Sequence, residues 1–105
     1  MTATEVRSLV EHQIGDDWNH TNLHDVELSR CLLAEPRVIT VQLPVREPCT
    51  EDVWLVLEEE SGAESGYLVT YSERTGCFGL AHFDPDTSPY LVGEYGDFFT
   101  ALDAM

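Results

Sequence analysis

The chain has 105 residues, about the length of one domain, and 43% of them are hydrophobic, which is ordinary for a folded globular protein. Twenty acidic residues face five arginines and no lysine, so the formal net charge at pH 7 is −15. This charge argues against direct binding to nucleic acid or to an anionic membrane, because both depend on Lys and Arg neutralising phosphate.

The first predicted element is a helix over residues 3–15. Thr2 and Glu5 have the spacing of a capping box, in which a hydroxyl and a carboxylate satisfy the first free N–H groups of a helix. Apolar residues then recur on one helical face: Val6, Leu9, Val10 and Ile14. Gly15 suits the left-handed residue that ends a helix.

A polar loop anchored by Trp18 is predicted next, over residues 16–24. The loose alternation in 26–33 and the β-branched alternation in 38–43 predict two strands. Because the segment around Pro36 breaks the pattern between them, we expect a hairpin there. Pro44 and Pro48 then bracket a loop.

Three antiparallel strands joined in sequence are the clearest part of the pattern. Residues 53–57 are apolar on both faces, which is typical of a central strand covered on each side. A flexible turn is predicted over 61–66, and alternation over 67–72 predicts the next strand. A short loop ending in Gly76 leads into a returning strand over 77–83.

The C-terminal part is predicted to be a loop over 84–89, a short strand or lead-in over 90–93, and a helix from about residue 95 to the end. The helix has one broad apolar stripe: Tyr95, Phe98, Phe99, Leu102 and Met105. The predicted fold is therefore a single α+β domain over 1–105. It consists of one antiparallel β-sheet of four to six strands, packed by an N-terminal and a C-terminal helix.

Two groups of residues have partial metal-binding patterns. His20 and His24 would share one face if they were helical, as zinc ligands often do, but the Glu of an HExxH motif is absent. Asp84, Asp86 and Ser88 have the alternate spacing that opens a calcium loop, without its Gly and its distal Glu. We expect loop histidines and a proline-shaped turn, and no metal or other cofactor.

The sequence has no catalytic motif. Cys31, Cys49 and Cys77 form no CxxC pair, and neither they nor the histidines carry a nucleophile signature. We expect Cys31, Cys77 and His82 to be core residues, and predict no enzyme activity. The N-terminus lacks the pattern of a signal peptide, and the longest apolar run, 53–57, is too short to cross a bilayer, so we expect a reduced, cytoplasmic location without a membrane partner.

Acidic clusters with aromatic neighbours are the remaining candidates for a binding surface, because such pairs suit hot spots for a basic partner. The clusters at 51–52 and 58–60 flank the predicted central strand and should lie at opposite ends of the sheet. A solvated acidic rim is the competing interpretation. The candidate partner-binding residues are Trp18, Glu51, Asp52, Glu58, Glu59, Glu60, Asp84, Asp86 and Tyr90.

Residues 31–105 resemble a family of small acidic bacterial proteins of uncharacterised function. The pieces that carry the resemblance are Cys31-Leu32-Leu33, Pro36-Arg37, Ile39, the run 53–59, Gly66-Tyr67, Val69, Tyr71, the run 78–81, Tyr95-Gly96, Phe98, Leu102 and Met105. The resemblance implies no catalytic residues. In size, acidity and closing helix the chain is also similar in general character to immunity proteins of bacterial toxin systems.

Three functional hypotheses remain open from the sequence. The first is an acidic protein-binding module, and its most concrete version is an immunity-type protein that neutralises a basic toxin domain. The second is a small metal-dependent hydrolase that uses His20, His24 and nearby carboxylates. The third is a self-associating structural subunit, such as a homodimer.

Overall fold

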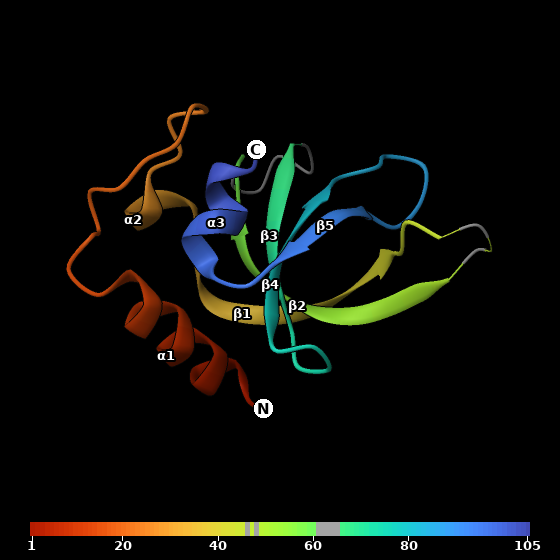
Figure 1. Cartoon of the computed structure of the whole chain (residues 1–105), viewed down its shortest axis with the longest axis horizontal. Helices are drawn as coiled ribbons and strands as arrows, with labels where there is room; N and C mark the ends of the chain where they lie inside the picture. Colours follow the sequence, from red (N-terminus) through yellow and green to blue (C-terminus); the bar gives the residue numbers. More distant parts are fainter. Residues whose placement is uncertain (46, 48, 61–65) are drawn as a thin grey trace.

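Five strands wind into a small barrel with the helices on one side, in a computed structural model that describes residues 1–45, 47, 49–60 and 66–105 (Figure 1). The fold is α+β, with one five-stranded sheet, an N-terminal helix and a C-terminal helix, as predicted. The elements in chain order are α1 (Ala3–Ile14), α2 (Leu28–Cys31), β1 (Leu32–Gln42), β2 (Thr50–Glu58), β3 (Tyr67–Ser72), β4 (Cys77–His82), β5 (Tyr90–Tyr95) and α3 (Phe98–Asp103).

The start of α1 confirms the predicted capping box. The Thr2 hydroxyl accepts a hydrogen bond from the Glu5 N–H at 3.2 Å, and the Glu5 carboxylate accepts one from the Thr2 N–H at 3.0 Å. Gly15 follows the last helical residue with φ of 58°, a conformation that glycine adopts without a steric penalty. Val6, Val10 and Ile14 are buried on one face of the helix, as their helical spacing predicts.

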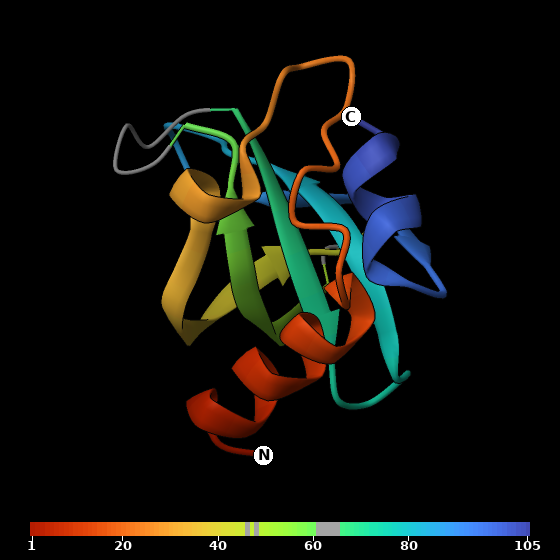
Figure 2. The same cartoon turned by 90° about the vertical axis from the view of Figure 1, so that its left-hand side faces the viewer.

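The barrel has two apolar cores, one on each face of the sheet. The outer core joins α1 and α3 to the sheet and includes Val10, Phe78 and Phe98. Figure 2 shows both helices lying in front of the strands on this side. The inner core contains strand residues only and fills the barrel: Val41, Val53, Leu55, Leu68, Ala81 and Leu91.

Strand β2 is covered on both faces, as predicted for a central strand. Val53 and Leu55 face the inner core, while Val56 and Leu57 both belong to the outer core. Two successive residues reach the same core because the register of β2 against β3 shifts between Leu55 and Leu57, as happens at a β-bulge. The β2–β3–β4 meander is antiparallel throughout, which confirms the three predicted strands.

The predicted hairpin across Pro36 is wrong. Strand β1 runs continuously through Pro36, and residues 28–31 form the short helix α2 instead of a strand. The register between β1 and β2 shifts between Leu32 and Arg37, so Pro36 lies at an irregularity, where the missing N–H does not break the ladder.

The C-terminal helix begins three residues later than predicted. Tyr95 is the last residue of β5 and pairs with Phe78 of β4. Asp97 has extended backbone, and its carboxylate accepts a hydrogen bond from the Thr100 N–H at 2.9 Å, which makes it the N-cap of α3. The free N–H of Phe98 donates to Gln13 Oε1 of α1 at 2.8 Å, which ties the two helices together.

Two loop predictions fall partly on residues that the structure does not describe. These are residues 61–65 of the predicted flexible turn, and residues 46 and 48 of the loop between β1 and β2. Among the described residues, no helix is long and apolar enough to cross a membrane.

Candidate functional site

The first and last strands of the barrel, β1 and β5, meet over a short stretch only. Gln42 and Tyr90 form the one register pair that the structure gives for β1 and β5, two strands whose residues are all described. The Gln42 N–H donates to Pro89 O at 2.7 Å, and its side-chain amide donates to Ser88 O at 2.7 Å. The residues of β1 that precede Gln42 therefore have β2 on one side and no paired strand on the other.

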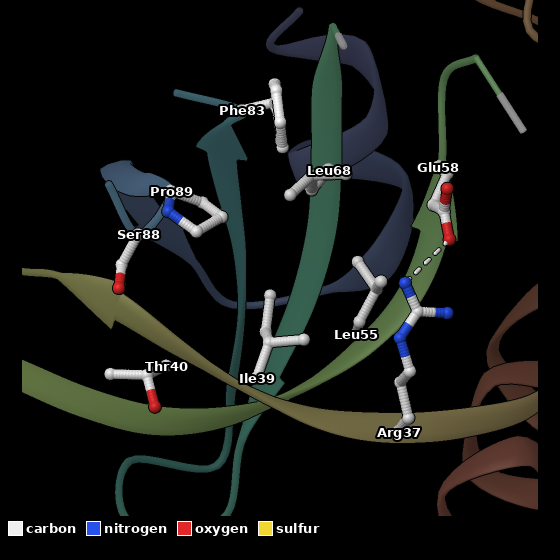
Figure 3. A pocket seen from close by; sticks show the side chains of 9 residues that line it. All are labelled: Arg37, Ile39, Thr40, Leu55, Glu58, Leu68, Phe83, Ser88 and Pro89. Carbon is white, nitrogen blue, oxygen red and sulfur yellow. Dashed lines mark ion pairs between the residues drawn. The ribbon is translucent and has the colours of Figure 1, made fainter. Parts of the chain in front are cut away.

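A cavity of about 320 Å³ lies beside this open stretch of β1 (Figure 3). Its walls come from β1, β2, β3 and the β4–β5 loop, and are made mostly of apolar side chains that belong to the inner core or extend it. The lining residues are Arg37, Ile39, Thr40, Leu55, Glu58, Leu68, Phe83, Ser88 and Pro89. This volume is at the lower end of the range for pockets that bind small molecules or single side chains.

One ion pair lies at the rim of the pocket, where Arg37 Nη2 lies 3.2 Å from Glu58 Oε1 (Figure 3). The Glu58 side chain is only 14% exposed, whereas the Arg37 side chain is 61% exposed. A carboxylate so far removed from water needs a cation or hydrogen-bond donors, and Arg37 supplies one such cation. The ion pair therefore joins a largely buried carboxylate of the pocket wall to a guanidinium that is exposed to solvent.

Five of the nine predicted partner-binding residues belong to the surroundings of this pocket. Glu58 lines it, and Asp52 Oδ1 accepts a hydrogen bond at 2.7 Å from the hydroxyl of Thr40, another lining residue. Asp84 and Asp86 lie in the β4–β5 loop that also supplies Phe83, Ser88 and Pro89 to the wall. Tyr90 follows Pro89 directly, is 45% exposed and stacks on His82 with ring centroids 5.6 Å apart.

The remaining four predicted residues have other neighbours. Glu51 lies at the other end of β2 from the 58–60 cluster. It pairs with Arg74 and raises the pKa of that guanidinium. Its second oxygen is buried and has no hydrogen-bond partner within the described residues. Glu59 contacts His24 and accepts a hydrogen bond from the Tyr67 N–H at 3.0 Å, and Glu60 beside it is exposed.

Trp18 lies on the helix side of the molecule. The guanidinium carbon of Arg7 lies 5.9 Å from the centre of its ring, a cation–π distance, and 38% of the residue is exposed. Trp18 therefore packs against α1 and is not one of the residues that line the pocket.

The two candidate zinc ligands bind different carboxylates. His20 Nε2 lies 2.8 Å from Asp103 Oδ1, whereas His24 contacts Glu59, and neither histidine is helical. In the calcium-like segment, Asp84 Oδ1 accepts a hydrogen bond from the Asp86 N–H at 3.0 Å, which makes a local turn. No group of three or more metal-ligating side chains occurs within the described parts of the chain.

Of the three residues predicted to lie in the core, only Cys31 is fully buried. Cys31 is buried, but Cys77 is half-buried, and all three cysteines are free thiols. His82 is half-buried, with its Nδ1 2.8 Å from Phe83 O and its ring between those of Tyr67 and Tyr90.

Sequence reasoning missed the residues that make the pocket, above all Arg37, Phe83 and Pro89. The alternation over 38–43 puts Ile39 on the same strand face as Val41 and Leu43, and in the structure this face points to the inner core. The ends of β1 and of the β4–β5 loop meet only through barrel closure, however, and no local pattern predicts that contact.

Searches of protein-family models, curated proteins and solved structures each find no match to this chain.

Proposed function

We propose that the protein is a binding module for a basic protein partner, and that the pocket and the carboxylates around it are the binding surface. The most concrete version is an immunity-type protein that covers a basic toxin domain and blocks access of its substrate. In this proposal the protein acts by binding, and its own side chains carry out no chemistry.

The observation that carries the proposal is that most of the described arginines are paired with carboxylates of the same chain. Of the four arginines in the described residues, three are in ion pairs with carboxylates of the same chain: Arg7 with Glu11, Arg37 with Glu58, and Arg74 with Glu51. These pairs occupy arginines that could otherwise contact an acidic partner, while the net charge of −15 creates a strongly negative field, which attracts basic surfaces and speeds their encounter.

The pocket gives this general attraction a specific location. Stable protein interfaces have an apolar centre that excludes water and a polar rim. Here the apolar centre is the pocket wall formed by Ile39, Leu55 and Leu68. Glu58 lies at its rim, and Asp52 is hydrogen-bonded to the lining residue Thr40. A basic partner with a protruding apolar side chain fits both parts.

Binding of short capped peptides, measured by fluorescence anisotropy at several NaCl concentrations, tests the proposal. A peptide with an apolar residue between lysines should bind, and its affinity should fall as salt rises. The same peptide with glutamates in place of the lysines should not bind. An affinity for the basic peptide that is independent of salt would contradict an electrostatic surface.

A pair of charge-matched variants locates the site. Asp52→Asn with Glu58→Gln removes two carboxylates at the pocket, and Asp16→Asn with Asp17→Asn removes two exposed carboxylates after α1. We expect the first pair to weaken binding of the basic peptide about tenfold or more, the size expected for losing one or two charge-assisted contacts, and the second pair by about twofold or less. Equal losses would mean that the peptide responds only to the overall charge.

A further inference from the structure

Strand β1 has an open edge beside the pocket, and two hydrogen bonds show which residues form it. The Leu43 N–H donates to Cys49 O at 2.9 Å, on the β2 side, and the Gln42 N–H donates to Pro89 O at 2.7 Å, on the β5 side. Because successive peptide groups of a strand point to opposite sides, Val38 and Thr40 direct their N–H and C=O groups to the same side as Gln42. Within the described strands, pairing with β5 stops at Gln42, so this edge is open at 38–40.

We propose that an extended basic segment of the partner adds to this edge as a further strand and places one apolar side chain in the pocket. This inference rests on the proposed function and specifies how the partner binds. Addition of a strand provides main-chain hydrogen bonds for affinity, while the pocket beside the edge selects the side chain.

The alternation of β1 predicts the sequence of the bound segment. Arg37 and Ile39 line the pocket, so the partner residue opposite Ile39 lies on the same face and enters the cavity. Partner residues opposite Val38 and Thr40 lie on the other face of the added strand. Thr40 itself lies at the edge of the cavity, and its hydroxyl is hydrogen-bonded to Asp52. The geometry therefore favours the order basic, apolar, basic, with the cation opposite Thr40 nearer to Asp52.

The same edge is poorly suited to a second copy of this chain. Proteins often protect open edges with lysine or proline, and here Pro36 limits the edge on its N-terminal side. Beyond Pro36, Val38 is 55% exposed, and the nearby carboxylates would repel another molecule with a charge of −15. A basic segment is attracted to this edge instead, because its positive charge compensates the negative charge of the nearby carboxylates.

Backbone N-methylation of a peptide probe separates strand addition from simple charge attraction. The probe is a capped peptide with Lys-Leu-Lys at its centre and Ser or Thr on either side. In an antiparallel arrangement the N–H groups of the two lysines point at β1, whereas in a parallel arrangement that of the leucine does. We expect one of these two methylation patterns to weaken binding at least tenfold, and the other to leave it within about twofold.

Two variants of the protein test the same edge. Val38→Pro removes an N–H that lies outside the β1–β2 ladder, and Val38→Ala removes the side chain but keeps the N–H. We expect Val38→Pro to bind the unmethylated probe at least tenfold more weakly than Val38→Ala. If Val38→Pro does not fold, the methylated peptides still decide the question.

The outcomes distinguish this inference from the proposed function. If the unmethylated probe does not bind to the natural protein, the proposed function itself fails. If it binds and neither methylation pattern weakens binding, the function stands and strand addition is overturned. If light scattering shows a dimer of the free protein that Val38→Pro converts to a monomer, a second copy occupies the edge and the proposed occupant is wrong.

Discussion

Gly79 occupies a position in β4 where its neighbours leave no room for a side chain. A Cβ atom added to it would lie 2.9 Å from Thr70 Oγ1, 3.1 Å from Gly93 O and 3.2 Å from Leu91 Cδ1. Thr70 is buried, and the Gly93 contact is with backbone, so neither can move away easily. We expect Gly79→Ala to lower the free energy of unfolding by about 1–3 kcal/mol, the usual cost of overpacking, as measured by urea denaturation.

Gly96 provides the matched control for this prediction. It lies between β5 and α3, and a Cβ there would meet no atom within 4 Å. Gly96→Ala should therefore change the free energy of unfolding by about 0.5 kcal/mol or less, as surface substitutions usually do. If both variants were equally stable, the barrel would be less tightly packed at β4 than the structure indicates.

Among the elements, those with complete local signals could be predicted from the sequence. Helix α1 carries its own cap and apolar face, and β2, β3 and β4 are separated by turns with recognisable residues. The errors at Pro36 and at residues 95–97 have a common cause. In both places the pairing of strands overrides the local pattern, since a register shift accommodates Pro36 and pairing with Phe78 holds Tyr95 in β5.

The candidate site was predictable only in part, for a related reason. Acidic residues such as Asp52 and Glu58 could be chosen because charge is visible in the sequence. The pocket that groups them requires β1 to meet the β4–β5 loop through the pair of Gln42 with Tyr90, which lie 48 positions apart as 90 − 42. Hydrophobic alternation shows which face of each strand points inward, but not which strand ends meet.

The start of α3 should depend on pH through Asp97. Hydrogen bonds from Thr100, first from its side chain and then from its N–H, hold the pKa of Asp97 below its ordinary value of 3.8. A lowered pKa in the folded state means that the cap stabilises the fold above pH 3.8 and is lost as the pH falls through the folded-state value. Asp97→Asn keeps a capping side chain that does not titrate. We therefore expect the natural protein to lose stability relative to Asp97→Asn as the pH falls below 3.8, measured by denaturation at several pH values.

A constant difference between the two proteins across this pH range would contradict the capping role of the carboxylate. Asp97→Ala gives the reference without a side-chain cap, and it should be less stable than both proteins at neutral pH. Its deficit relative to the natural protein should shrink in acid, because the protonated Asp97 then also loses much of its cap.

At the scale of the whole molecule, two electrostatic effects of opposite sign compete. Repulsion among carboxylates destabilises the compact state, and salt relieves it; the ion pairs of Arg7, Arg37 and Arg74 stabilise it, and salt weakens them. In each of the three pairs at least one of the two side chains is half exposed or more, and such pairs contribute little, about 0–1 kcal/mol each. An excess of fifteen negative charges in a molecule with a radius of gyration of 12.7 Å should outweigh them.

We therefore expect the melting temperature at pH 7 to rise as NaCl is increased from about 20 to about 300 mM, since the Debye length falls below the size of the molecule. If salt relieves about 1 kcal/mol of this repulsion, the melting temperature should rise by about 4–8 °C in a domain of this size. NaCl is preferred to sulfate, which stabilises proteins through exclusion from their surface. Near the isoelectric point, about pH 4.2, repulsion is small and the rise should disappear. A melting temperature that falls with NaCl at pH 7 would show that the ion pairs outweigh the repulsion, and that the outward field on which binding of a basic partner depends is weaker than its charge implies.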